Sequence, residues 1–198
     1  MTERPILFQA AMVRAILDGR KRQTRRIVKP CKDRDFGCEL APHEIAGEVN
    51  AGNYRNSRHG APGDRLWVRE SFSRLESFDF FNPACPDDVP DFWYWADGDP
   101  EWGNWTKPKP SIHMPREACR IVLEITGLRV EKLQDISQDD AVAEGCDDIR
   151  DMQPRPGRIM YEGGPRAAYQ VLWESINGSG SWAANPWVWV VEFWRIEG

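Results

Sequence analysis

The chain has 198 residues, is 41% hydrophobic and 29% charged, and carries a formal net charge of −5. A chain of this length and composition buries a core, which excludes a broadly disordered protein, and its acidic balance argues against a general nucleic-acid coating protein. Ten tryptophans contrast with three widely separated histidines. The composition therefore disfavours a zinc site built on histidine, and we expect neither a metal nor a cofactor.

Charge is distributed unevenly along the chain. Residues 1–30 carry eight Lys and Arg against two acids, and a basic segment on an acidic body favours a small or specific anionic ligand over a long polyanion. The five cysteines include no CxxC pair, which predicts free thiols in a reducing cytoplasm. Because the N-terminus lacks a signal pattern and no apolar run reaches membrane-spanning length, we expect a cytoplasmic protein without a membrane partner.

The first third of the chain is expected to hold short elements around a basic turn. Apolar spacing predicts a helix over Gln9–Leu17, and it predicts strands over Pro5–Phe8, Thr24–Val28 and Arg65–Phe72. Residues 31–60 are polar and lack periodicity, which is typical of a long excursion from the domain.

The middle third is rich in aromatic residues and proline. Residues 73–91 are loop-like, and Phe92–Trp95 forms a dense aromatic segment that predicts a strand. Asp97-Gly98 is a hairpin-turn signal, which would place Trp102 and Trp105 on the returning arm. The prolines between 108 and 115 predict an extended segment.

The last third contains the strongest patterns. Alternating apolar residues predict a strand over Arg120–Leu133 with a break at Gly127, and Ser137 is a cap signal for a helix over Gln138–Glu144 that Gly145 ends. Residues 147–165 are loop-like. A helix follows over Arg166–Ile176, then a strand over Pro186–Ile196 whose Trp187 and Trp189 are expected to pack on that helix. The inward residues predicted for the helix are Ala167, Val171, Leu172 and Ile176.

This order of elements predicts the α+β class. Strands without regular βαβ alternation favour a small mixed β-barrel, closed or partly open, with a few short helices. We expect a single domain over 1–198 with insertions at about 31–60, 73–111 and 147–165, where proline and glycine are frequent.

The segment Gly19–Arg26 is the most informative one for chemistry, because five of its eight residues are cationic. Neighbouring positive charges lower the pKa of a lysine, so Lys21 becomes a candidate base toward the hydroxyl of Thr24, three residues on. The alternative is that these Arg and Lys side chains are simply solvated or bind a phosphate, and the spacing alone favours that alternative.

Gly19-Arg20-Lys21 followed by Thr24 and Arg26 resembles the signature of ASCH domains, which share the PUA-like β-barrel. The resemblance continues through Pro62–Leu66, Ile121–Val130, Leu133–Ser137, Ala141–Gly145 and Val188–Ile196, and so covers most of the chain outside the insertions. The segments Pro110–Arg116 and Gly180–Trp187 are similar to the longer version encoded by bacteriophages and prophages, which implies the cytoplasm of a bacterial host.

The best-defined activity in that family belongs to small N4-acetylcytidine amidohydrolases, which are described as using a lysine, a threonine and a glutamate. The matching positions here are Lys21, Thr24 and Glu144. The resemblance implies that Lys21 takes the proton of Thr24, whose hydroxyl attacks the acetyl carbonyl, while Glu144 protonates the departing amine. Arg26 would hold the base carbonyl or stabilise developing negative charge. Without the resemblance, Glu144 is more typical of a surface helix residue.

Four further residues complete the predicted substrate-binding set: Arg20, Glu70, Trp105 and His113. Within the aromatic segment, Trp105 is the residue expected to stack on a base, although aromatic residues on a strand more often belong to the core. His113 is a candidate ligand donor, although a lone histidine more often bonds local backbone.

The sequence is compatible with three functions. The first is a hydrolase that cleaves the amide of an N4-acylated cytosine nucleoside or a related modified base. The second is a non-catalytic PUA-like reader that binds modified nucleic acid or single-stranded RNA or DNA. The third is a metal-independent ribonuclease. The acidic remainder of the chain favours a modified nucleoside or nucleobase as the partner.

Overall fold

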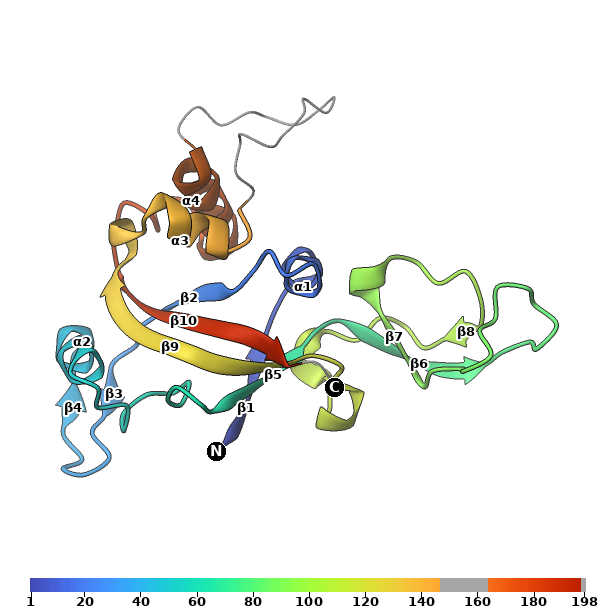
Figure 1. Cartoon of the computed structure of the whole chain (residues 1–198), viewed down its shortest axis with the longest axis horizontal. Coiled ribbons are helices and arrows are strands. Elements are labelled where there is room, and N and C mark those ends of the chain that lie inside the picture. Colours follow the sequence, from blue (N-terminus) through green and yellow to red (C-terminus); the bar gives the residue numbers. More distant parts are fainter. Residues whose placement is uncertain (147–163, 197–198) are drawn as a thin grey trace.

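A computed structural model describes residues 1–146 and 164–196 of the chain. Its centre is a five-stranded sheet in the order β1-β5-β9-β10-β2 (Figure 1). The pairs are antiparallel except for β1 with β5, which is parallel. The strands span β1 Glu3–Leu7, β2 Gln23–Ile27, β5 Arg65–Arg69, β9 Val122–Lys132 and β10 Trp187–Ile196.

Two smaller sheets accompany the central one. A two-stranded sheet pairs β3 (Cys31–Lys32) with β4 (Glu39–Leu40). A three-stranded sheet in the order β7-β6-β8 extends away from the centre (Figure 1); it contains β6 (Phe72–Ser77), β7 (Phe92–Tyr94) and β8 (Asn104–Trp105).

The helices are short and lie around the central sheet. The α-helices are α1 (Ala10–Leu17), α2 (Pro42–Asn50), α3 (Gln138–Ala143) and α4 (Gly164–Asn177). The 3₁₀ turns are η1 (Trp95–Asp97), η2 (Ser111–His113), η3 (Arg116–Ala118) and η4 (Leu133–Asp135). The mixed α+β class is therefore confirmed.

The two faces of the sheet carry separate cores, which the alternation of β10 makes visible. Trp189, Val191 and Phe193 belong to a core shared with α1 and α2, whereas Val188 and Val190 belong to a core shared with α3 and α4. Because successive strand residues point to opposite faces, one strand serves both cores. The expectation that Trp187 and Trp189 pack on the last helix is wrong, since both contact the α1 and α2 side.

The central sheet is open within the described residues. β1 and β2 are its outer strands, and each pairs with only one neighbour. The closed form of the predicted barrel therefore does not occur there. The long strand β9 does carry the irregularity predicted at Gly127, because its register with β10 shifts between Glu192 and Phe193, where an extra residue forms a bulge and increases the bend.

Several local predictions are wrong for identifiable reasons. α2 lies inside the supposed excursion at 31–60, begins with Pro42 at its first turn and buries Ile45 and Val49. β6 occupies part of the predicted loop at 73–91, and it lies between β7 and β8. The hairpin predicted from Asp97-Gly98 therefore does not form, because both arms pair with β6. Turn η2 interrupts the predicted extended segment at 108–115.

The predicted helix near the C-terminus exists as α4, and Leu172 packs against the core as predicted, but the rest of its buried face is different. Tyr169 and Trp173 are buried, whereas Val171 is 42% and Ile176 39% exposed. The aromatic residues give a larger apolar area to bury than the branched aliphatic ones, and they set the orientation of the helix. Most of the predicted loop at 147–165 lies outside the described residues.

The described residues include no helix that is long and apolar enough to span a membrane.

Candidate functional site

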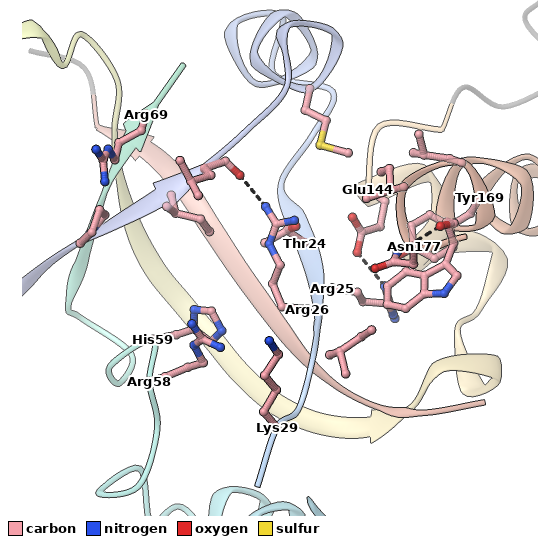
Figure 2. Close-up of a pocket in the computed structure, with 18 residues that line it drawn as sticks. Thr24, Arg25, Arg26, Lys29, Arg58, His59, Arg69, Glu144, Tyr169 and Asn177 are labelled. Atoms are coloured by element: carbon pink, nitrogen blue, oxygen red, sulfur yellow. Dashed lines mark hydrogen bonds and ion pairs between the residues drawn. The ribbon is translucent and has the colours of Figure 1, made fainter. Parts of the chain in front are cut away.

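A cavity of about 620 Å³ lies at the open side of the sheet, between the outer strands β1 and β2 and under α4 (Figure 2). A volume of this size suits a small organic ligand. The apolar lining comes from the following residues: Pro5, Ile6, Leu7, Met12, Ile27, Leu172, Trp173 and Ile176. The remaining lining residues are polar, charged or phenolic, namely Thr24, Arg25, Arg26, Lys29, Arg58, His59, Arg69, Glu144, Tyr169 and Asn177.

A buried ion pair stands at one wall of this cavity. Lys21 Nζ lies 2.7 Å from Glu144 Oε2 and donates a second hydrogen bond of 2.9 Å to the Glu144 carbonyl. Both side chains are almost completely buried. Burial lowers the pKa of Lys21, while the Glu144 carboxylate opposes that shift, because a charged amine is costly in an environment with little water.

The carboxylate of Glu144 is held from its other side by Arg25. Arg25 Nη1 lies 3.2 Å from Glu144 Oε1, and Arg25 Nη2 lies 2.7 Å from Glu131 Oε1 and 3.3 Å from Asp140 Oδ2. Together, these residues form a charge-compensated group, which we call the ion network: Lys21, Arg25, Glu131, Asp140 and Glu144. Such compensation is what allows buried charges to persist.

Local backbone structure brings the two halves of the network together. Ser137 caps α3 by accepting a hydrogen bond from the Asp140 N–H, as predicted. Glu144 ends that helix, and its backbone pairs with that of Lys21. Gly145 follows with a φ of 89°, and a Cβ there would lie 3.3 Å from Lys21 Cβ. Glycine therefore serves both the left-handed turn and the close approach of the two segments.

Thr24 and Arg26 lie on the opposite face of β2 from Arg25. In the antiparallel register, Thr24 is opposite Val191 and Arg26 is opposite Trp189, whereas Arg25 is opposite Val190. The cavity extends around the free edge of β2, so that side chains from both faces line it (Figure 2). Arg26 Nη2 also donates a 2.6 Å hydrogen bond to the Leu7 carbonyl, which joins the two outer strands across the opening.

The other face of the cavity is cationic. Arg26, Lys29, Arg58 and Arg69 line it, and none of them forms an ion pair with a carboxylate of the described residues. Figure 2 shows Arg26, Lys29 and Arg58 on the side of β2 away from Glu144. We call these four residues the cationic group.

His59 lies beside the cationic group and is neutral at ordinary pH. Burial, with the nearby charges of Arg58, Arg26 and Arg4, lowers the pKa of His59 to about 3. Its ring packs edge-on against Trp189 with 5.6 Å between centroids. The Nε2 atom is buried and has no hydrogen-bond partner among the described residues, a condition that a bound ligand would relieve.

The structure brings only part of the predicted site together. Thr24, Arg26 and Glu144 line the cavity, and Lys21 contacts it through Glu144. Lys21 is not a lining residue of this cavity; it lines a smaller hollow of about 310 Å³ beside Trp194.

The other predicted ligand residues lie away from the cavity. Arg20 is on the surface and pairs with Asp18 at 2.8 Å, and His113 is exposed in η2. Glu70 is buried against Arg120, with 2.9 Å between Arg120 Nε and Glu70 Oε1, and burial raises the pKa of Glu70. Trp105 Nε1 donates to the Trp102 carbonyl within the three-stranded sheet.

Sequence reasoning missed several residues that line the cavity. Arg58 and His59 sit in a stretch that was interpreted as an excursion, and Tyr169 was not assigned to the buried face of its helix. Arg25 was within the basic segment, and strand alternation would have separated it from Arg26. No pattern in the sequence predicts that the loop with Arg58 and His59, strand β2 and helix α4 line one cavity.

Among residues 1–146 and 164–196, no cluster of three or more His, Cys, Asp or Glu side chains is arranged to hold a metal ion. Comparisons with known proteins add no assignment: no family model matches the chain, and neither does any curated protein or solved structure.

Proposed function

We propose that the protein is an amidohydrolase that removes the acyl group from an N4-acylated cytosine nucleoside or a related modified base. The observation that carries this proposal is the buried Lys21–Glu144 pair at the wall of a ligand-sized cavity that Thr24 also lines. A base, an acid and a hydroxyl nucleophile are the groups that acyl transfer requires.

The Lys21–Glu144 pair supports the required proton movements. Burial lowers the pKa of Lys21, and the 2.7 Å contact offers a direct path for its proton to the Glu144 carboxylate. Transfer along that path leaves a neutral amine, which is a base, and a carboxylic acid, which is a proton donor. The pair therefore supplies both partners of the reaction without any net charge change.

In the proposed reaction, the Thr24 hydroxyl adds to the acetyl carbonyl and gives up its proton to the Lys21 amine. The C–N bond then breaks, and Glu144 donates its proton to the departing exocyclic amine. Water hydrolyses the resulting Thr24 ester, releasing acetate and restoring the hydroxyl. Arg26 is on the same strand face as Thr24, which suits it to stabilise negative charge on the carbonyl oxygen.

We also propose that the fold is related to the PUA-like barrels of ASCH domains. An open five-stranded sheet whose outer strands are linked by Arg26 and Leu7 is compatible with such a barrel. Part of the segment that resembles the ASCH signature, Gln23–Arg26, lies on the outer strand β2 beside the cavity, which supports this proposal. The longer, phage-type version of the family and its host cytoplasm belong to the same proposal.

The test is release of cytidine and acetate from N4-acetylcytidine by the purified protein. Thr24→Val keeps the buried shape but removes the nucleophile, and we expect kcat/KM to fall by about 10³-fold. Thr24→Ser, which keeps a hydroxyl, should restore much of the activity. Lys21→Met should resemble Thr24→Val.

Lys32→Gln is a matched control, because Lys32 is exposed on β3 and does not line the cavity; its activity should equal that of the wild type. A wild-type protein that is inert toward acetylated nucleosides, nucleotides and oligonucleotides would refute the proposed function. Full activity of Lys21→Met would refute the mechanism while leaving the function standing.

A second candidate is a reader that binds modified or single-stranded nucleic acid without chemistry. The cationic group favours it, because unpaired Arg and Lys side chains bind phosphates. Salt-sensitive binding of RNA or DNA oligonucleotides without product formation would identify the reader. Backbone cleavage that persists in chelator would instead identify the metal-independent ribonuclease.

A further inference from the structure

The charges of the cavity fall into two groups with different needs. Glu144 is already satisfied by Lys21 and Arg25. The four members of the cationic group face the same cavity and lack a carboxylate partner within the described chain. Positive charges held close together repel one another, and a bound anion is the simplest way to compensate them.

Three members of the cationic group, Arg26, Lys29 and Arg58, lie near one another, whereas Arg69 stands apart from them (Figure 2). The charge of Arg58 is felt at both Arg26 and His59, where it lowers the pKa in each case, after burial as the larger cause. In Figure 2 the side chains of Lys29, Arg58 and His59 lie around one space below Arg26. His59 Nε2 adds a buried polar atom that has no partner among the described residues.

We propose that the cavity takes its substrate as a nucleoside monophosphate, with the phosphate bound by Lys29 and Arg58 beside His59. This inference rests on the proposed function and names its substrate class. Lys29 and Arg58 supply charge-assisted hydrogen bonds to the phosphate oxygens. His59, which carries no charge at neutral pH, donates one further hydrogen bond from Nε2.

A single nucleotide fits the charge distribution better than a nucleic-acid chain. The protein carries a net charge of −5 although it contains these four cations, so the rest of the chain is strongly acidic. Proteins that follow a nucleic-acid backbone present cations along an extended surface, typically for about 6–10 phosphates. Here four cations that lack a carboxylate partner line one cavity of about 620 Å³.

The substrate preference follows from this arrangement. N4-acetylcytidine 5′-monophosphate should be deacetylated with a kcat/KM about 10- to 100-fold above that of N4-acetylcytidine, because charged hydrogen bonds to the phosphate strengthen binding. Rising NaCl concentration should reduce this preference, since the exposed cations are screened.

Charge-neutral variants locate the phosphate. Arg58→Gln and Lys29→Gln should each reduce the nucleotide-to-nucleoside ratio of kcat/KM by about three- to tenfold. The matched controls are Arg55→Gln, whose residue pairs with Asp35 on the surface, and Lys32→Gln on β3. Both controls remove one positive charge outside the cavity, and we expect the ratio to be unchanged.

Binding separates this inference from the proposed function. Calorimetry with cytidine 5′-monophosphate and cytidine needs no turnover, and the monophosphate should bind at least tenfold more tightly, with the difference reduced in Arg58→Gln. That result in a protein without deacetylase activity would support the phosphate site and refute the proposed function.

Equal binding of the two compounds, or equal turnover of the two substrates, would overturn the phosphate site. An acetylated hexanucleotide preferred more than tenfold over the monophosphate would overturn the single-nucleotide assignment.

Discussion

The ion network reaches the cavity through Arg25 and Glu144, and the cationic group lines the same cavity, but the two groups differ in how their charges are compensated. Glu144 is held by Lys21 at 2.7 Å and by Arg25 at 3.2 Å, all within protein. Lys29 and Arg58 are exposed and have no carboxylate partner in the described part of the chain. Compensated charges hold α3 on the sheet, while uncompensated charges keep the cavity ready for an anion. We therefore expect the ion network to contribute to stability as well as to the proposed chemistry, and the cationic group to contribute to ligand binding alone.

The largest expected effect comes from breaking the ion network at its centre. Glu144→Gln leaves Lys21 and Arg25 facing each other without their shared carboxylate, and the free energy of unfolding should fall by about 3–5 kcal/mol. Lys21→Met should cost less, about 1–2 kcal/mol, because Glu144 keeps Arg25. Urea unfolding followed by circular dichroism measures both.

The double variant Lys21→Met/Glu144→Gln sharpens this comparison. It should lose less stability than the sum of the single variants, because each substitution removes the partner that the other leaves unsatisfied. Strictly additive losses would contradict the coupling that the network geometry implies.

An intermediate effect on stability is expected from His59, which lines the cavity beside the cationic group. Its pKa in the folded protein is about 3, well below the ordinary value of 6.5. The folded state therefore resists protonation, so this contribution to stability is complete above pH 6.5 and is lost as the pH falls toward 3.

Within that window, the slope should approach about 1.4 kcal/mol per pH unit. His59→Gln should flatten the stability profile between pH 6 and 4, measured by urea unfolding at fixed ionic strength. A profile as steep as that of the wild type would show that another group controls this range.

The smallest effect on stability should follow from neutralising the cationic group. Lys29→Gln combined with Arg58→Gln should change the free energy of unfolding by no more than about 0.5 kcal/mol, because neither residue forms an ion pair with a described carboxylate. Thermal unfolding without ligand measures this. A loss comparable to that of Glu144→Gln would mean that these cations serve the fold.

Elements with strong local signals could be predicted from the sequence. β9 has alternating apolar residues, β10 is an almost continuous apolar run, and α3 has a serine cap at one end and a glycine at the other. α2 was missed although two of its signals are local, a proline in the first turn and Glu44, which accepts a hydrogen bond from the Ala41 N–H. The pairing of β7 and β8 with β6 could not be inferred, because it depends on a segment inserted between them in space.

The residues of the candidate site also fall into those that local sequence predicts and those that only the tertiary structure brings together. Thr24 and Arg26 could be grouped because they are two residues apart on one strand. The partnership of Lys21 with Glu144 came from the family resemblance, since 123 positions separate them. Arg58 and His59 could not be placed beside β2, because only the packing of the whole domain brings that loop to the cavity.

The open edge of β2 has a consequence for how copies of this protein behave toward one another. Unpaired strand edges invite edge-to-edge association, and charged side chains are a common means of discouraging it. Arg26 and Lys29 place positive charge at or just beyond that edge, so a second copy approaching it meets like charge. A polyanion that neutralised these side chains would remove the repulsion. Besides the ligand binding that we propose for them, Arg26 and Lys29 are thus expected to oppose edge-to-edge association of the sheet.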